Sequence, residues 1–188
     1  MADKNYRRRL GLDPKTDNYR VGRVSEYELR RRRIPIFSTP SDKRKAVSWM
    51  KAGWNFYDAL RKEGVVEYPR AGSRRMFETF PHGGFTVLIG KRPYMKTMVE
   101  GLLQRQLLLY EEGLNIPDPM GLLEEWTRHR VLKGQLSRTG LHSRNELDAL
   151  MAAYTAFLLE REVERVITVG DPSEGQIILP GDALKDQY

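Results

Sequence analysis

The chain has 188 residues, enough for one domain with a buried core, and it contains no cysteine. Disulfide staples, zinc–thiolate sites and thiol nucleophiles are therefore excluded. Its most apolar run, residues 149–159, is about half of the ~20 residues that a membrane span needs, and the basic N-terminus lacks the apolar stretch of a signal peptide. We expect a cytoplasmic protein with no membrane segment.

The positive charge is concentrated in the first part of the chain. Residues 1–75 carry 20 Lys and Arg against 9 Asp and Glu, a net charge of +11, whereas the remainder has a net charge of −4. Such a basic segment indicates a polyanionic partner, most commonly nucleic acid, although a solvated basic surface explains the same charge.

Helical and strand-like segments alternate along the chain and predict an α/β fold. Residues 1–20 are polar and basic and predict an arm or loop, followed by a domain over residues 21–188. Apolar spacings of three and four predict helices over 24–33, 42–63, 96–112 and 119–132 and one that starts at Ser143. Strands are expected at 65–68, 76–80, 164–169 and 176–179, while residues 85–89 fit either a strand or a short helix.

Three of these helices carry apolar stripes that predict the core. The expected core residues are Val47, Met50, Trp54, Tyr57 and Leu60 in the first, Val99, Leu102, Leu103, Leu107 and Tyr110 in the second, and Leu147, Leu150, Met151, Tyr154 and Leu158 in the third. We also assign Trp49, Trp54 and Trp126 to the core, because a base-stacking role would require exposed rings beside basic groups.

Two acids stand at positions that suit a metal ion. Glu78 lies near the end of an expected strand, and Asp148 lies on the first turns of an apolar helix. Carboxylates on two such rigid elements can converge on one point and hold a hard cation such as Mg²⁺. Ser143 and Glu146 form a Ser-x-x-Glu capping box, so we assign Glu146 to the helix cap rather than to a ligand set.

Several stretches, in order along most of the chain, resemble the family known as domain of unknown function 429, predicted nucleases with an RNase H-like fold. They are Tyr19-Arg20, Glu28-Leu29-Arg30 to Phe37, Met76 to Pro81, Lys96-Thr97 with Glu100 to Arg105, Arg144 to Ala156, and Gly170 to Pro180. That family is similar to RuvC-type resolvases.

The resemblance implies an RNase H-like mixed sheet flanked by helices and a metal-dependent, phosphodiester-cleaving activity. Glu78 matches the family's later-strand acid and Asp148 its last-helix Asp, so both are expected to be catalytic and to bind Mg²⁺ or Mn²⁺. The family's first strands, with their Gly-Ile-Asp motif, have no counterpart, and Arg7, Arg8 and Arg9 stand where it carries another acid. We therefore expect a sheet that is incomplete at its N-terminal end.

Each candidate residue also has a plainer interpretation. Glu78 could pair with Arg74 or Arg75 at the surface, and Asp148 could complement the helix N-terminus. His82 is assigned to a loop. Nucleic-acid contacts are expected from Lys96, which could equally be solvated, and from Arg30, Arg31, Arg32, Arg33 and Arg144.

Two functions follow from these observations. One is a nuclease-type domain, in a degenerate form because two-metal chemistry usually needs more acids than two. The other is a non-catalytic module that binds nucleic acid or a partner on the same scaffold. An open sheet edge would also invite a second copy or a complementing chain to pair with it.

Overall fold

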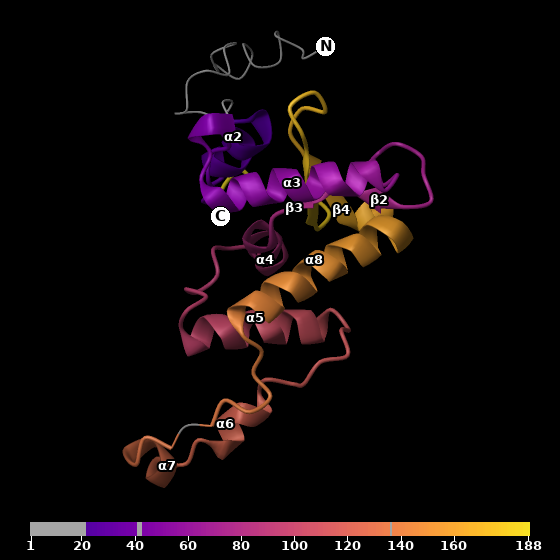
Figure 1. The fold of residues 1–188 in the computed structure, drawn as a ribbon. Helices are drawn as coiled ribbons and strands as arrows, with labels where there is room; N and C mark the ends of the chain where they lie inside the picture. Colours follow the sequence, from indigo (N-terminus) through magenta and orange to yellow (C-terminus); the bar gives the residue numbers. More distant parts are fainter. Residues whose placement is uncertain (1–21, 41–42, 136) are drawn as a thin grey trace. The chain divides into compact units, whose positions relative to one another are not determined.

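A computed structural model of the chain describes residues 22–40, 43–135 and 137–188 (Figure 1). The arm predicted for residues 1–20 lies outside the described residues. The helices are α2 (Val24–Arg31), α3 (Ser48–Lys62), α4 (Pro81–Ile89), α5 (Val99–Glu111), α6 (Gly121–Glu125), α7 (Arg128–Leu132) and α8 (Arg144–Arg161), with single 3-10 turns at Lys43–Lys45 and Val163–Arg165. The strands are β1 (Val66–Glu67), β2 (Arg75–Met76), β3 (Glu78–Thr79), β4 (Val166–Val169) and β5 (Ile177–Pro180).

The fold is mixed α/β, with two small sheets. β1 and β2 form a parallel pair, and the second sheet has the strand order β3-β5-β4. β3 is parallel to β5, with Glu78 opposite Ile177 and Thr79 opposite Ile178. The chain divides into two compact units, one formed by residues 22–79 and 168–178 and the other by residues 80–167 and 179–186, so the boundary passes through β4 and β5. We call them unit 1 and unit 2.

In unit 1, α3 begins later than the sequence predicts. The helix expected from Asp42 starts instead at Ser48, after a 3-10 turn, and Val47 is its extended N-terminal cap. Consecutive cations at Lys43, Arg44 and Lys45 would oppose the positive end of a helix dipole, which favours the later start. The predicted stripe of α3 is at most half-buried, and no residue of the helix is fully buried.

The strand expected over residues 76–80 is split in two. β2 ends at Met76 and β3 starts at Glu78, so Phe77 marks the point where the chain leaves one sheet and joins the other. The Phe77 carbonyl accepts a hydrogen bond from the Tyr57 hydroxyl (2.9 Å), and Thr79 Oγ1 donates to Ile178 O (2.7 Å). These side-chain bonds hold β3 in place despite its two-residue length.

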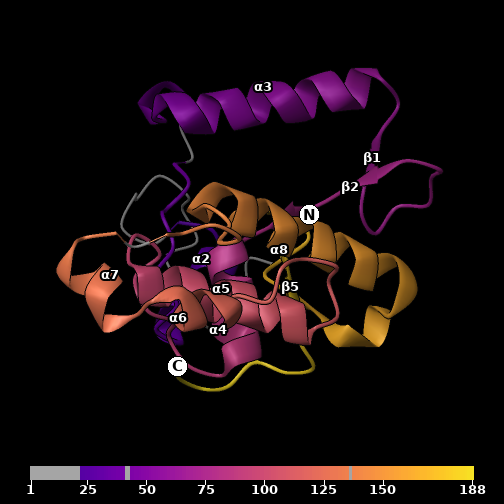
Figure 2. The same ribbon diagram turned by 90° about the horizontal axis from the view of Figure 1, so that it is seen from below.

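Unit 2 is built on a helical core in which α8 packs against α4 and α5 (Figures 1 and 2). The α8 stripe is confirmed at Leu147, Met151, Tyr154 and Leu158, which are buried, whereas Leu150 is half-buried. Phe85 of α4 completes this cluster, which settles residues 85–89 as helix. Gly84 allows the close approach, since a Cβ there would lie 2.9 Å from Met151 Sδ.

The face predicted for α5 is partly wrong. The helix buries Leu102, Arg105, Gln106 and Leu109, whereas Tyr110 is exposed. Gln106 is tolerated there because its amide donates to Pro117 O and Gly140 O, at 2.9 and 2.7 Å, which satisfies its buried polar groups. A stripe counted from apolar residues alone does not include such positions.

The helix predicted over residues 119–132 is two helices. α6 ends at Glu125 and α7 begins at Arg128. Thr127 between them has extended backbone, and its side chain accepts from the backbone N–H of Arg130 (3.3 Å), a helix cap that starts α7.

Candidate functional site

The Asp148 carboxylate is positioned by the start of α8. The predicted capping box is confirmed: Ser143 N donates to Glu146 Oε2 (2.7 Å) and Glu146 N donates to Ser143 Oγ (3.3 Å). These hydrogen bonds lower the pKa of Glu146. These hydrogen bonds fix where the helix begins. Asp148 lies on its second turn, directly after the buried Leu147, and its side chain is about a quarter exposed (26%).

The two oxygens of Asp148 have different surroundings. Lys96 Nζ donates to Oδ2 at 2.8 Å, whereas Oδ1 is buried and has no hydrogen-bond partner. A buried carboxylate oxygen without a partner is costly, so it marks a position where a ligand would be stabilised. Asp148 thus already binds one cationic group and retains an acceptor for another.

The backbone that carries Lys96 is held by two residues of α5. Arg105 is fully buried and its Nη1 donates to Tyr94 O (2.9 Å) and Gly101 O (2.7 Å), while its guanidinium lies 5.4 Å from the centre of the Phe85 ring. A Cβ on Gly101 would lie 2.0 Å from Met95 O, so only glycine lets this segment approach the helix. Arg105 and Gly101 therefore determine where Lys96 stands.

Positive charge surrounds this acid. Burial lowers the pKa of His82 to about 4, helped by the charges of Arg105, Arg92 and Lys96, while Asp148 acts in the opposite direction. Burial also lowers the pKa of Arg105, and Asp148 partly offsets that shift. His82 lies in the first turn of α4, so its assignment to a loop was wrong.

A pocket of about 450 Å³ opens next to this group in unit 2, and its lining is mixed, with three cations, one acid and the apolar Leu102 and Leu141. Its charged and polar residues are Lys96, Thr97, Arg138, His142, Ser143, Arg144 and Glu146. His142 Nε2, like Asp148 Oδ1, is buried without a hydrogen-bond partner. Lys96 connects the two features, because it lines the pocket and also binds Asp148.

Glu78 is in unit 1, and Arg23 holds it by both oxygens. Arg23 Nη1 donates to Oε2 (2.7 Å) and Nη2 donates to Oε1 (2.6 Å), while Arg23 Nε donates to the buried Glu26 (2.9 Å). Burial opposes the charge of Arg23, but these two acids outweigh it and raise its pKa. The sequence pointed to Arg74 or Arg75 as the partner of Glu78, and the partner seen here is Arg23.

The arginine run after α2 is engaged within unit 1. Glu28 pairs with both Arg31 (2.9 Å) and Arg32, and Arg30 donates to Ser38. The hydrogen bonds from both arginines outweigh burial and lower the pKa of Glu28. Arg33 is exposed, with φ at +65°. Much of the run therefore has a structural role, and its nucleic-acid contacts stay a prediction.

The structure brings together three of the predicted site residues in unit 2, namely Lys96, Arg144 and Asp148. Glu78 belongs to unit 1. A metal ion shared by Glu78 and Asp148 therefore stays a prediction. No three His, Asp or Glu side chains in the described part of the chain form a group that could hold a metal.

Sequence reasoning missed Arg23, Arg105 and Arg138. Of these three, only Arg105 could have been found from the sequence, because it lies at helical spacing between Leu102 and Leu109 and therefore on the buried face.

A family model described as protein of unknown function, DUF429, matches residues 10–174. The chain belongs to this family. No curated protein and no solved structure matches the chain. Glu78, Lys96 and Asp148 all fall within the DUF429 match.

Among the described residues, no helix has the length and apolar character required to cross a membrane.

Proposed function

We propose that this protein is an RNase H-like, metal-dependent nuclease-type domain of low activity, which acts on phosphodiesters at the pocket beside Asp148. One observation carries the proposal: Asp148 keeps a buried, unpartnered Oδ1 while Lys96 joins its other oxygen to a pocket that also contains Arg138 and Arg144. Membership of a family that resembles RuvC-type resolvases supports the same reaction class.

The residues of the pocket suit an anionic substrate. Lys96, Arg138 and Arg144 would neutralise the phosphate oxygens, and a bidentate arginine contact would also orient them. Burial keeps His82 neutral near pH 7, so it adds no positive charge near Asp148 that would repel a divalent ion. Ser143 and Glu146 are occupied by the helix cap and remain outside the chemistry.

Asp148 would contribute one carboxylate oxygen to a site for one divalent ion. Asp148 Oδ1 is an unoccupied hard oxygen ligand, and Mg²⁺ is commonly held by one or two carboxylates together with substrate phosphates. A divalent ion held there would stabilise charge developing on the phosphodiester and lower the pKa of a bound water. A complete two-ion set is not present among the described residues, which is the reason for expecting low activity.

The test is a cleavage assay on the full chain with Mn²⁺ and labelled single- and double-stranded DNA and RNA. The variants are Asp148→Asn, Glu78→Gln and, as a matched loss of charge on an exposed acid of unit 2, Glu164→Gln. We expect slow turnover that Asp148→Asn abolishes and Glu164→Gln preserves. Turnover that survives in Asp148→Asn, or no turnover at all, contradicts the catalytic proposal.

The Arg23–Glu78 pair favours a second candidate, a non-catalytic nucleic-acid-binding module. A carboxylate whose two oxygens both accept from one guanidinium is a poor metal ligand, because the metal would have to displace two charge-assisted hydrogen bonds. Under this alternative, the chain binds oligonucleotides with a steep salt dependence, with a log–log slope of about −0.7 to −0.9 per phosphate contact, and never cleaves them. Cleavage that depends on Asp148 rules it out.

A further inference from the structure

Two aromatic rings stand at the surface of unit 1. Phe37 is 75% exposed and Trp49 is 58% exposed, so the assignment of Trp49 to the core was wrong. The rings pack edge to face, with centroids 5.7 Å apart and an angle of 65° between their planes. Phe37 comes from the extended segment after α2, and Trp49 comes from the first turn of α3.

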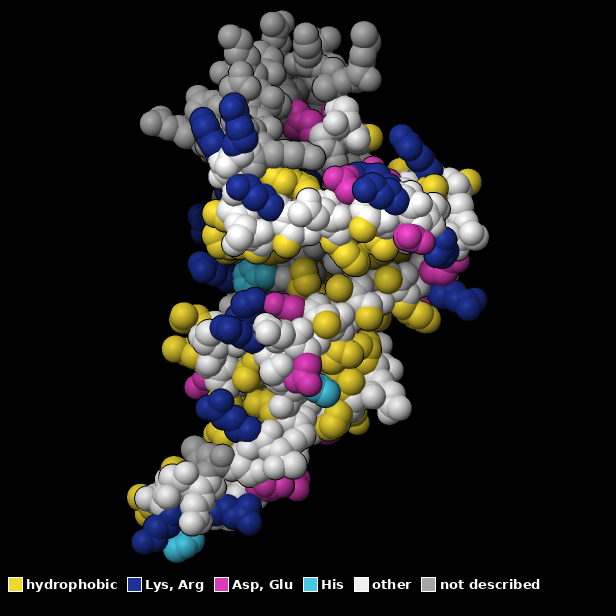
Figure 3. Space-filling view, viewed as in Figure 1, with side chains coloured by type: hydrophobic (Ala, Val, Ile, Leu, Met, Phe, Trp, Pro, Cys, Tyr) yellow, Lys and Arg dark blue, Asp and Glu magenta, His cyan; other side chains and the backbone are white. Residues whose placement is uncertain are grey.

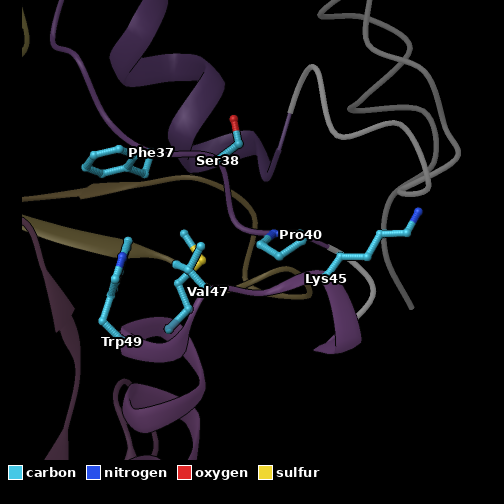
Figure 4. A pocket seen from close by; sticks show the side chains of 7 residues that line it. Phe37, Ser38, Pro40, Lys45, Val47 and Trp49 are labelled. Carbon is cyan, nitrogen blue, oxygen red and sulfur yellow. The ribbon is translucent and has the colours of Figure 1, made fainter.

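These rings form one side of a pocket of about 270 Å³ (Figure 4). Phe37 and Trp49 lie on one side of it and Lys45 on the other, with Val47 and Pro40 between them. Ser38 and Met50 complete the lining. The pocket is thus apolar and aromatic at one end and carries a cation at the other.

The segment that supplies Lys45, Val47 and Trp49 to the pocket is basic. Residues 43–51 contain four Lys and Arg and no Asp or Glu. Hydrophobic and basic side chains lie near each other at the surface along α3 (Figure 3). Exposed rings beside basic groups are the arrangement by which proteins bind single-stranded nucleic acid, because the bases stack on the rings and the cations follow the backbone.

We propose that Phe37 and Trp49 form a stacking platform for a base of single-stranded DNA or RNA, with Lys45 contacting the adjacent phosphate. A duplex is disfavoured, because its bases are already stacked on one another and offer no free face to the rings. The platform lies in unit 1 and does not need cleavage at Asp148. It relies on the proposed function only for the class of ligand, a nucleic acid.

The experiment measures binding of the full chain, in EDTA and low salt, to three fluorescent probes by anisotropy. They are a short oligothymidylate, an abasic strand of the same length with the same phosphates, and a duplex. The test variant is Phe37→Ala with Trp49→Ala. The matched control is Phe56→Ala, which removes an exposed ring (61%) from α3 outside the pocket lining.

We expect the oligothymidylate to bind about tenfold or more tightly than the abasic strand, since stacking contributes ~1–3 kcal/mol per base and 1.4 kcal/mol is a factor of ten. The double variant should lose that advantage and bind both strands alike. Phe56→Ala should stay within about twofold of the wild type, because exposed rings outside the pocket make no base contact. Trp49→Tyr should retain binding because it keeps a ring at the same position.

Three results would overturn the platform. They are equal binding of the oligothymidylate and abasic strands by the wild type, an equal loss in Phe56→Ala, and a change in sedimentation of the free protein on ring removal. The last would show that the rings bury against a second copy. Because this binding is measured in EDTA, where metal-dependent cleavage does not occur, failure of the catalytic proposal is distinguishable from failure of the platform.

Discussion

The interiors of the two units are stabilised by different mixtures of interactions. Unit 2 has a conventional apolar core, in which Leu147, Met151 and Leu158 of α8 are fully buried against α4 and α5. In unit 1, α3 has no fully buried residue, and the buried Glu26 is bonded to Arg23 and to the backbone N–H of Thr39. In unit 1, charge pairing therefore adds to an apolar core that includes the fully buried Leu29, Ile34 and Ile177.

The same difference separates the two candidate acids. Glu78 belongs to the charge network that organises unit 1, because Arg23 links it to Glu26. Asp148 stands beside a core that is already apolar, and its Oδ1 has no partner in the described structure. An acid that is not part of such a network is the better candidate for a ligand, so the proposal places the ligand at Asp148 rather than at Glu78.

The largest effect is expected from the core of unit 2. Leu158→Ala should lower the free energy of unfolding by about 2–5 kcal/mol, because it removes a fully buried side chain and leaves a cavity. Phe56→Ala on α3 should change it by less than about 0.5 kcal/mol. Urea denaturation followed by circular dichroism measures both. Equal losses would show that α3 is as tightly packed as α8.

The charge network of unit 1 should be next in size. Arg23→Met leaves the buried Glu26 without its guanidinium partner and should cost about 3 kcal/mol. Arg61→Met removes an arginine whose pairs with Asp58 and Glu67 are about half exposed, and it should cost less than about 1 kcal/mol. The same denaturation experiment compares them. Similar small losses for both would mean that the Arg23 pairs do not organise unit 1.

The two acids should differ in their effect on folding. Glu78→Gln weakens the bidentate pair and should lower stability by about 1 kcal/mol, a value discounted for its partial exposure. Asp148→Asn weakens the pair with Lys96 but also removes a partly buried negative charge, so stability should stay within about 0.5 kcal/mol of the wild type or rise. A larger loss in Asp148→Asn would place that acid among the structural groups.

The smallest effect is a dependence of stability on pH in unit 2. The folded-state pKa of His82 is lowered to about 4, below its ordinary value of 6.5, so the unfolded chain binds more protons in between. Stability from this group is complete above pH 6.5 and is lost as the pH falls towards 4. His82→Gln should reduce the loss of stability between pH 7 and pH 5, whereas the exposed His129→Gln should not. An unchanged pH slope in His82→Gln would show that His82 is solvated.

The sequence predicted the helices best where one pattern decides the structure. The Ser143–Glu146 capping box and the stripe of α8 placed that helix correctly, because local capping and apolar burial agree there. The predicted bounds were wrong where residues outside the element determine where it begins or ends. The two-residue strand β3 depends on β5, far along the chain, and the start of α3 depends on the cations before it.

The candidate site was predictable only in part. Asp148 and Lys96 came from the family resemblance, but their ion pair joins residues 52 positions apart, and no local pattern reports it. Arg105 was overlooked because a buried arginine in an apolar face is rare and costly; its Nη1 donates to the carbonyls of Tyr94 and Gly101, whereas its buried Nε has no hydrogen-bond partner. The exposure of Trp49 could not be read from its spacing.

The central claim is that Asp148 shares a divalent ion with a bound phosphodiester, and coupling between the two ligands tests it directly. Oligothymidylate affinity should be measured with and without Mn²⁺ for the wild type, Glu78→Gln and Asp148→Asn. Because linkage is reciprocal, Mn²⁺ should tighten binding several-fold in the wild type and in Glu78→Gln, and should have no effect in Asp148→Asn. Equal tightening in Asp148→Asn, or none in the wild type, would contradict the assignment of Asp148.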